Sequence, residues 1–327
     1  MEEYAMKKFK VKSIIMYLLV ITLMLAIFTG CTSKSKNEEG TDSESKIEKN
    51  VSKVKYPMEV VDQFGNKVTL EKQPERIVSL APSHTEILFS LGLGDKIVGV
   101  TSYCDYPEEA KTKEKVGSFD GINIEKVIEL NPDLVVQYGE GDEEVVGKIK
   151  EAGIPVVSYE PESVEDVIKT IKEIGNVTGA VEEAEKVTKA MEEKENEITE
   201  KIKDAKKVKV FYEIWNDPLM AAGPGSFMDQ LINLAGGENI AKDAQGEYPQ
   251  FDVEQLIERN PDVYLTSQDL EEKTVDSIKA RPGYANINAV KNDRIYLLDP
   301  NIVLRPGPRI VDALEIVAKV LHPDLFK

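Results

Sequence analysis

Short runs of β-branched and apolar residues alternate with longer stretches of helical spacing from about residue 76 onward. In the first half, this pattern predicts strands at 76–80, 97–100, 134–136 and 156–157, and helices at 85–91 and 144–152. Such alternation is typical of an α/β sandwich with a mainly parallel sheet. Ser83 and Glu86 have the spacing of a capping box, which places the start of the first helix there.

The second half of the chain repeats this plan. Strands are predicted at 208–212, 263–265 and 295–298, and helices at 226–235, 252–259 and 309–321. We therefore predict two Rossmann-like α/β lobes with mainly parallel sheets and a ligand cleft between them.

One passage occurs twice, at 119–136 and at 248–265. Each copy reads as a capped helix, then Asn-Pro-Asp, then a strand, with Asn123 and Asp252 as the predicted caps. Glu125 and Glu254 fall in the first turn of their helices. The duplication indicates two similar lobes, and the matched glutamates indicate one partner that touches both.

A long charged segment, 164–205, separates the halves and is interrupted near Gly175 and Gly179. Between 181 and 205 its few apolar residues are spaced to form a thin helical stripe. We predict a rigid connecting helix at 176–205 between lobes at 56–175 and 206–327, so large lobe closure is not expected. The alternative is an ordinary surface helix.

The N-terminal segment has the features of an export signal. Lysines precede an apolar run over 14–28, which is short for a membrane span and stops at Thr29-Gly30-Cys31. This end resembles the lipobox of bacterial lipoproteins, although Phe28 replaces the usual leucine. We expect a signal peptide at 1–30, acylation of Cys31 and a disordered tether at 31–55. The alternative is an uncleaved anchor, and both place the protein outside the cytoplasm.

Composition excludes several functions. The formal net charge is −18, which argues against a nucleic-acid partner. Cys104 has no second cysteine for a disulfide once Cys31 is acylated, and the two histidines cannot form a histidine-rich zinc site. We predict that His84 contacts water in a capping loop, with contact to a metal centre as the alternative. No nucleophile with a base at recognisable spacing occurs, and Ser226, in its glycine-rich turn, has no nearby histidine, so no enzyme is predicted.

Several motifs together resemble one family. They are Arg76-Ile77-Val78-Ser79-Leu80-Ala81-Pro82, Ser102-Tyr103-Cys104-Asp105-Tyr106-Pro107, both repeats, Gly236-Gly237-Glu238-Asn239-Ile240 and Arg305-Pro306-Gly307-Pro308-Arg309. The chain from Tyr56 to its end is similar to the substrate-binding proteins of ABC importers for cobalamin, ferric siderophores and haem. The resemblance implies a monomer that docks on a dimeric permease through Glu125 and Glu254. Taken singly, each glutamate is also explained by the favourable interaction of a carboxylate with the positive end of the helix dipole.

The resemblance also implies which residues bind the ligand. They are Tyr103, Phe119 and Tyr138 from the first lobe, Trp215 and Tyr248 from the second, and Arg305, whose alternative is a surface position. Flat aromatic faces suit a large planar macrocycle. We therefore predict a corrinoid ligand and no cofactor or resident metal. Haem or a ferric siderophore is the alternative, while an extracellular enzyme and an adhesin are more remote.

Overall fold

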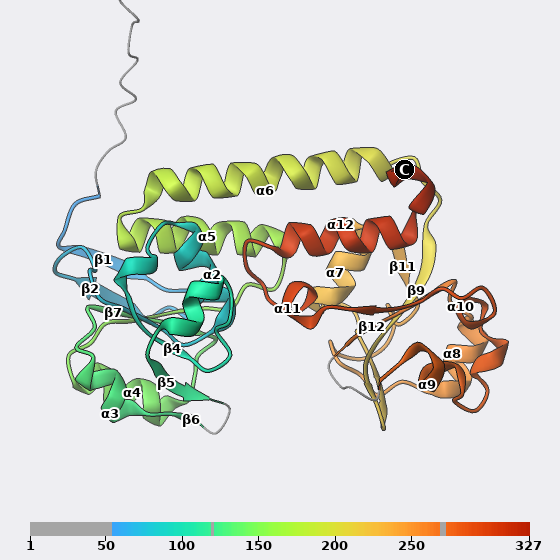
Figure 1. Ribbon diagram of the computed structural model, residues 1–327, viewed down its shortest axis with the longest axis horizontal. Coiled ribbons are helices and arrows are strands. Elements are labelled where there is room, and N and C mark those ends of the chain that lie inside the picture. Colours follow the sequence, from blue (N-terminus) through green and yellow to red (C-terminus); the bar gives the residue numbers. More distant parts are fainter. Residues whose placement is uncertain (1–53, 119–120, 269–272) are drawn as a thin grey trace, which may run out of the picture. The chain divides into compact units, whose positions relative to one another are not determined.

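The computed structural model describes residues 54–118, 121–268 and 273–327. The predicted signal peptide, Cys31, most of the tether and Phe119 lie outside the described residues. From Val51 onward the chain forms one compact unit, in which two α/β lobes lie under a helical layer (Figure 1). Within the described ranges, no helix combines the length and apolar character that a membrane crossing requires.

The first lobe is built on a six-stranded sheet with the strand order β6-β5-β4-β3-β7-β8. All neighbouring strands are parallel except β5 and β6. The strands are β3 (Ile77–Ser79), β4 (Ile97–Thr101), β5 (Lys115–Ser118), β6 (Gly121–Ile122), β7 (Leu134–Tyr138) and β8 (Val156–Tyr159). The helices are α2 (Pro82–Ser90), α3 (Ile124–Glu129) and α4 (Glu143–Glu151), and the hairpin of β1 (Met58–Val61) and β2 (Lys67–Leu70) precedes them.

The second lobe has a five-stranded sheet, in which β9 pairs in parallel with β12 and β11 and antiparallel with β10. Its strands are β9 (Val208–Asn216), β10 (Leu219–Ala221), β11 (Gly237–Asn239), β12 (Val263–Ser267) and β13 (Ile295–Leu298). Its helices are α7 (Phe227–Leu234), α8 (Val253–Arg259), α9 (Val275–Lys279), α10 (Asn288–Lys291), α11 (Pro300–Val303) and α12 (Ile310–Leu321). The mainly parallel α/β fold predicted from the sequence is confirmed.

The duplicated passage has the same backbone path in both lobes. Asn131 and Asn260 follow α3 and α8 with φ of 45° and 48°, a left-handed conformation that asparagine tolerates and that ends a helix. The next aspartate then donates its backbone N–H to a carbonyl at the start of a sheet strand: Asp133 to Arg76, just before β3, at 2.7 Å, and Asp262 to Lys209, the second residue of β9, at 2.9 Å. The repeat therefore positions the helix that carries each matched glutamate.

The two predicted caps differ. The Asn123 side chain accepts a hydrogen bond from the backbone N–H of Lys126 at 3.0 Å, as a cap does. Asp252 also occupies the predicted N-cap position, but its side chain makes no capping hydrogen bond.

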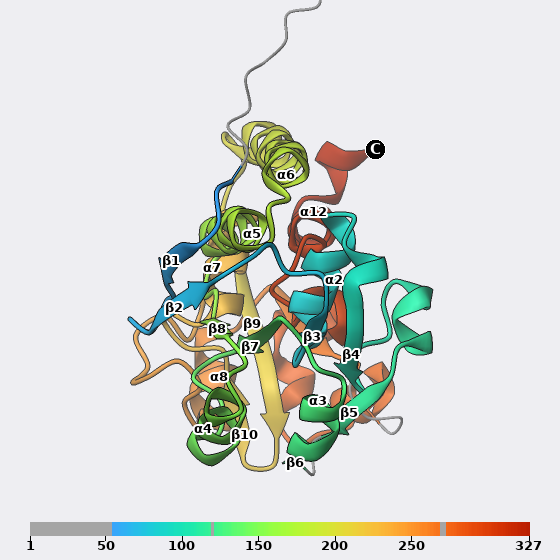
Figure 2. The same cartoon turned by 90° about the vertical axis from the view of Figure 1, so that its left-hand side faces the viewer.

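Helices α5 (Val164–Thr178) and α6 (Val181–Ile202) form a layer above both lobes, and α12 completes it (Figures 1 and 2). Gly175 lets α5 approach α6 closely, because a β-carbon there would lie 2.5 Å from that of Ala184. At the other end, Lys194 of α6 pairs with Asp312 and Glu315 of α12 at 2.6 and 2.8 Å. Helix α6 is thus attached to both lobes.

The connecting helix begins later than predicted. Helix α5 continues through Thr178, beyond the expected boundary at 176, and Gly179, with φ of +74°, ends it. The predicted apolar stripe is present: Met191, Ile198 and Ile202 are buried.

The start of α2 also differs from the prediction. Ala81 is the N-cap and Pro82 begins the helix, so Ser83 and Glu86 form no capping box. Proline fits the first helical position because it has no N–H to leave unsatisfied. The Glu86 side chain is therefore available for a distant partner.

That partner is the segment that joins α11 to α12 in the second lobe. Arg309 donates from Nε and Nη2 to the two oxygens of Glu86, at 2.8 and 2.7 Å, and its guanidinium lies 3.9 Å from the ring centre of Tyr106. Arg305 pairs with Asp105 at 2.6 Å and approaches Glu86 at 3.3 Å. The Glu86 side chain is only 2% exposed, so this pairing takes place away from water. These contacts hold the two lobes together beside the cleft.

Replacing Glu86 by glutamine should destabilise the protein. The change leaves the partly buried Arg309 guanidinium without its buried counter-charge, and we expect the free energy of unfolding to fall by about 3 kcal/mol, measured by urea unfolding. The exposed Glu108, 85% exposed on its side chain and paired with Lys111, provides the matched control. Glu108→Gln should change the same quantity by less than about 0.5 kcal/mol. Equal effects of the two substitutions would contradict a stabilising role of the interlobe pairs.

Candidate functional site

Two adjoining cavities lie between the lobes. The larger measures about 430 Å³ and the smaller about 210 Å³, and they share Tyr138, Leu304 and Pro306. On the side of the first lobe, their walls come from residues at or just after the carboxyl ends of β3, β4, β7 and β8, the edge at which open parallel sheets bind ligands. We call the two cavities together the cleft.

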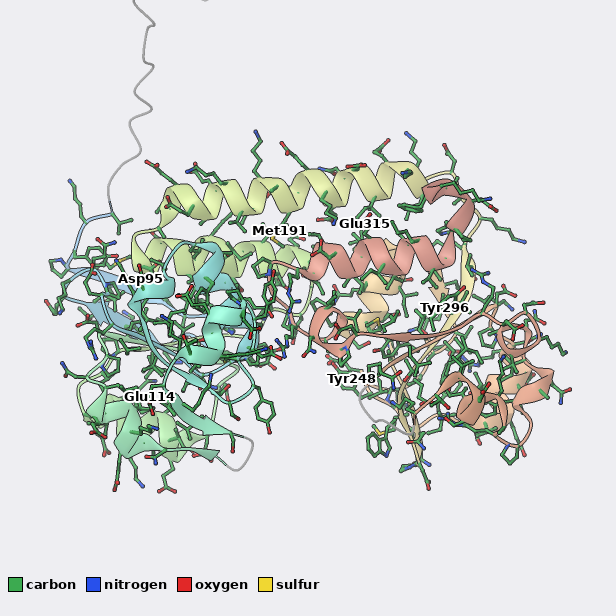
Figure 3. The ribbon with its side chains drawn as sticks, in the orientation of Figure 1. Asp95, Glu114, Met191, Tyr248, Tyr296 and Glu315 are labelled. Carbon is green, nitrogen blue, oxygen red and sulfur yellow. The ribbon has the colours of Figure 1, made fainter. Side chains whose placement is uncertain are left out.

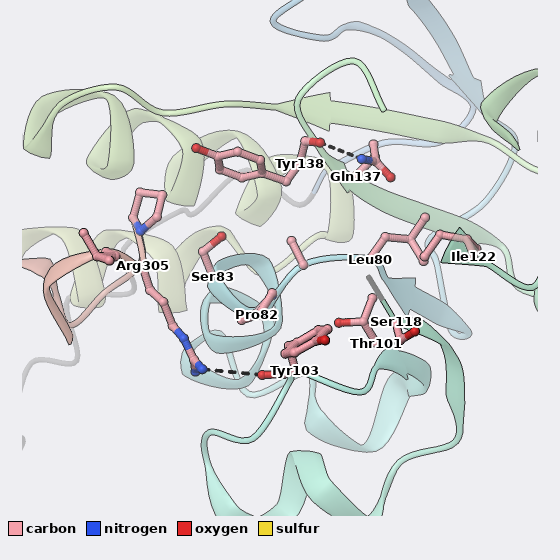
Figure 4. A pocket seen from close by; sticks show the side chains of 13 residues that line it. Leu80, Pro82, Ser83, Thr101, Tyr103, Ser118, Ile122, Gln137, Tyr138 and Arg305 are labelled. Atoms are coloured by element: carbon pink, nitrogen blue, oxygen red, sulfur yellow. Dashed lines mark hydrogen bonds between the residues drawn. The ribbon is translucent and has the colours of Figure 1, made fainter. Parts of the chain in front are cut away.

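The larger cavity is walled mainly by the first lobe (Figure 4). Tyr103 is 41% exposed and presents its ring to the space between Pro82 and Thr101. Aliphatic side chains and small hydroxyls fill the rest of the wall, and the second lobe contributes only the segment 304–306. The further lining residues are Leu80, Ala81, Ser83, Ser118, Ile122, Gln137, Tyr138, Leu304, Arg305 and Pro306. This wall suits a large ligand that is mostly apolar.

Arg305 reaches the cleft but is not free to neutralise a ligand. It pairs with Asp105 and Glu86, and its second nitrogen meets the side chain of Asn301 and, at 3.5 Å, the carbonyl of Tyr103. Its side chain is 14% exposed. Arginine and carboxylate charges therefore cancel within the protein.

The smaller cavity has a different character. Glu160 and Glu162 of the first lobe and Glu247 of the second contribute to its wall, together with Tyr138 and Tyr248. Tyr248 is 51% exposed (Figure 3). The remaining lining residues are Pro161, Ile214, Gly225, Phe227, Met228, Val303, Leu304 and Pro306. Across this cavity the lobes are joined once more, by the Gln230 side-chain amide, which donates to the Glu162 carbonyl at 2.9 Å.

Behind Tyr138 lies His84, which the sequence placed in contact with water. The structure contradicts that prediction: His84 is fully buried, its ring meets Tyr138 edge to face at 5.7 Å, and it stacks near Tyr159 at 6.3 Å. Burial lowers the pKa of His84 to about 3, so the ring is neutral. The ring packs against Tyr138. Burial, and to a lesser extent the negative charge of Glu160, raises the pKa of Tyr138 to about 12.

The other predicted ligand residues lie as follows. Tyr103, Tyr138, Tyr248 and Arg305 come together in the cleft. Trp215 lines neither cavity; it lies near the end of β9, 41% exposed, and its indole N–H donates to the Asp217 carbonyl at 2.9 Å. The structure thus brings four of the predicted residues together and leaves Trp215 outside.

Sequence reasoning missed the acidic and apolar parts of the wall. Glu160 and Glu162 follow β8 directly, and Leu304 and Pro306 flank Arg305. The position just after a predicted parallel strand was the available signal for the two glutamates. Leu304, 47% exposed, carried no such signal because it follows a short helix.

Among the described residues one serine lies beside a histidine: Ser83 Oγ is 3.3 Å from His84 Nδ1, but the other ring nitrogen of His84 has no hydrogen-bond partner, so no acid orients the ring. No group of three or more His, Cys, Asp or Glu side chains among them is placed to hold a metal ion. Ser226 is fully buried, caps α7 by accepting from the Asp229 backbone N–H and donates to the Gly223 carbonyl. Its hydroxyl thus has a structural role.

Glu125 and Glu254 are exposed in the first turns of α3 and α8. Both helices lie on the side of their lobes away from α6 (Figure 1). Neither carboxylate forms an ion pair with any residue that the structure describes. The two glutamates are therefore available to an external partner.

The model of the family described as "Periplasmic binding protein" matches residues 77–302, which include both repeats and the first-lobe walls of the cleft. The chain belongs to this family. Its members are substrate-binding proteins rather than enzymes, so the family and the non-enzymatic class predicted from the sequence are confirmed.

Three relatives show the range of the family. An uncharacterized ABC transporter substrate-binding lipoprotein of Bacillus subtilis, YvrC, is 37% identical over 95% of this chain and 96% of its own. A vitamin B12-binding protein of Vibrio parahaemolyticus is 31% identical over 77% and 91%. Among solved structures, the apo form of the haem-binding protein RhuT from Roseiflexus superposes with a TM-score of 0.70 at 29% identity, covering 77% of this chain and 99% of that one. This protein is thus an extracytoplasmic solute-binding protein of the ABC importer type.

Acid should destabilise the protein through His84. Its folded-state pKa lies below the ordinary value of 6.5, so the unfolded chain binds the extra proton first. The stabilisation is complete above about pH 6.5 and is lost as the pH falls toward 3. Relative to His84→Phe, the wild type should lose about 2 kcal/mol of unfolding free energy between about pH 7 and pH 5 in urea titrations. The Glu108→Gln protein should keep the wild-type dependence, and identical pH profiles for wild type and His84→Phe would show that the ring is not buried neutral.

Proposed function

We propose that this protein captures a corrinoid outside the cytoplasm and delivers it to the permease of an ABC importer. The observation that carries the ligand choice is the charge of the cleft. Its one lining cation among the described residues, Arg305, is already paired with Asp105 and Glu86. An anionic chelate would meet no free counter-charge there, whereas a neutral macrocycle with amide groups would meet tyrosine faces and hydroxyls.

The alternative ligands are haem and a ferric siderophore. The likeness to a haem-binding protein favours the first of these. Haem, however, carries two propionates, and the paired state of Arg305 leaves them unmatched. The sequence relative named as a vitamin B12-binding protein supports the corrinoid.

We further propose that the protein is anchored to the cell membrane through acylated Cys31, after removal of residues 1–30, and that residues 31–55 tether it. The Bacillus subtilis relative, which is named a lipoprotein, matches over 95% of this chain and supports this assignment. The ligand-binding body then comprises the two lobes with helix α6 between them, and it acts as a monomer.

Binding of cyanocobalamin tests the ligand. Protein lacking residues 1–31 should bind it with a dissociation constant below about 1 μM, which corresponds to about −8 kcal/mol, measured by equilibrium dialysis with absorbance detection. The fluorescence of Trp215 should fall in parallel, because the corrin ring absorbs where tryptophan emits, although Trp215 lies outside both cavities. Haem and a ferric hydroxamate serve as competitors. Retention of either one in place of cyanocobalamin would overturn the corrinoid assignment.

Docking is assigned to Glu125 and Glu254. One unpaired carboxylate at a matched position on each lobe suits the two like subunits of a permease, because charge pairs across an interface set orientation and association rate. Each glutamate also lies at a helix N-terminus, where a carboxylate contributes under about 1 kcal/mol to stability. That smaller role does not explain why the pair recurs.

The double variant Glu125→Ala with Glu254→Ala tests docking. It should retain the affinity of the wild type for ligand within about twofold and lose cellular uptake, because charge pairs of this kind act across the interface. The matched control is Glu182→Ala with Glu185→Ala, two exposed glutamates on α6, which should leave both quantities unchanged. A loss of ligand affinity in the first variant would contradict docking, because it would show that Glu125 and Glu254 support the ligand site or the core.

A further inference from the structure

The smaller cavity of the cleft has an acidic wall that the proposed function does not use. Glu160, Glu162 and Glu247 line it, and we call these three residues the acidic wall. Glu247 and Glu162 are exposed and Glu160 is half-buried. None of the three forms an ion pair with a residue within the described ranges, whereas the arginines at the opposite side of the cleft are fully paired.

The acidic wall is fixed by the backbone on both sides of the cleft. Glu160 donates its backbone N–H to the side-chain oxygen of Gln63 at 2.7 Å, and its carbonyl accepts from the Gln63 amide at 2.9 Å. The Glu247 carbonyl accepts from the backbone N–H of Gly223 at 2.7 Å. Glu160 and Glu162 thus line the cavity from the first lobe and Glu247 from the second, each on a backbone held by a hydrogen bond.

The acidic wall raises the pKa values of two neighbouring tyrosines. Burial raises the pKa of Tyr248, and Glu247, Glu162 and Glu160 raise it further. The same applies to Tyr138, where Glu160 and Glu162 add to burial. Tyr138 and Tyr248 thus lie within the electrostatic influence of the acidic wall, and the apolar neighbours Phe227 and Met228 reduce the screening of its charge.

We propose that the acidic wall selects ligands by charge: it favours corrinoids of net positive charge over neutral ones and repels anionic chelates. This inference rests on the proposed corrinoid function and extends it. Tyrosine rings next to carboxylates form a surface that attracts a cation through both its charge and its π-faces. No described cation in the lining of the cleft offsets the three carboxylates.

Two forms of one corrinoid separate charge from shape. Aquacyanocobinamide carries one positive charge and dicyanocobinamide none, while the ring and its amide side chains are the same. At low ionic strength, wild-type protein should bind the charged form about tenfold more tightly. The preference should fall below about twofold in 1 M salt, where the screening length shrinks to about 3 Å.

The variant that tests the acidic wall is Glu160→Gln with Glu162→Gln and Glu247→Gln, which removes the charge at constant shape. It should bind both forms with similar affinity and still bind cyanocobalamin. The matched control replaces three glutamates of α6, Glu182, Glu185 and Glu197, by glutamine; it changes the net charge equally and should keep the preference. The salt dependence of the wild-type protein tests the same point without any variant.

The possible outcomes distinguish failure of the charge selection from failure of the proposed corrinoid binding. Binding of both cobinamides with equal affinity by the wild type at low salt would overturn the charge selection alone. A preference that survives in the triple variant would overturn it as well, because the axial ligand rather than the acidic wall would then be its cause. Failure of the wild type to bind cyanocobalamin and both cobinamides would overturn the corrinoid function and, with it, this inference.

Discussion

The arrangement of the two lobes depends on one buried carboxylate. Glu86 belongs to the first helix of the first lobe, yet its partners, Arg309 and Arg305, come from the segment before the last helix of the second. Breaking a buried pair of this kind by removing one partner costs about 3 to 5 kcal/mol, because the remaining charge is left without compensation. The pairing therefore favours the lobe arrangement in which all these charges meet.

This constraint acts together with the helical layer. Helix α6 packs on α5 and is joined to α12 by Lys194, while the residues preceding α12 carry the arginines. The second lobe is thus attached to the first through the same C-terminal segment from two directions: through α6 above and through Glu86 beside the cleft. Leu304 and Pro306, which belong to that segment, line both cavities as a consequence.

Local patterns predicted the elements of the fold well, because strand spacing, helical stripes and the Asn-Pro-Asp repeat are short-range features. The errors arose where a short-range pattern competed with a distant partner. Ser83 and Glu86 have the spacing of a capping box, but the helix already begins at Pro82, one residue before Ser83. Glu86 instead binds an arginine 223 residues away. Likewise, His84 lies next to a turn in the sequence and yet is enclosed by tyrosines from two later strands. No pattern of neighbouring residues records such partners.

The charge of the cleft shows the same limit more sharply. From the sequence, Arg305 was the candidate cation for a ligand, whereas Glu160 and Glu162 gave no sign that Glu247, 85 residues after Glu162, lines the same cavity. In the structure Arg305 is paired within the protein, whereas the three carboxylates form no ion pair with a described residue, so the unpaired charge of the cleft is negative. In a cleft built from two lobes, ligand preference follows from the charges that remain after the lobes have been joined.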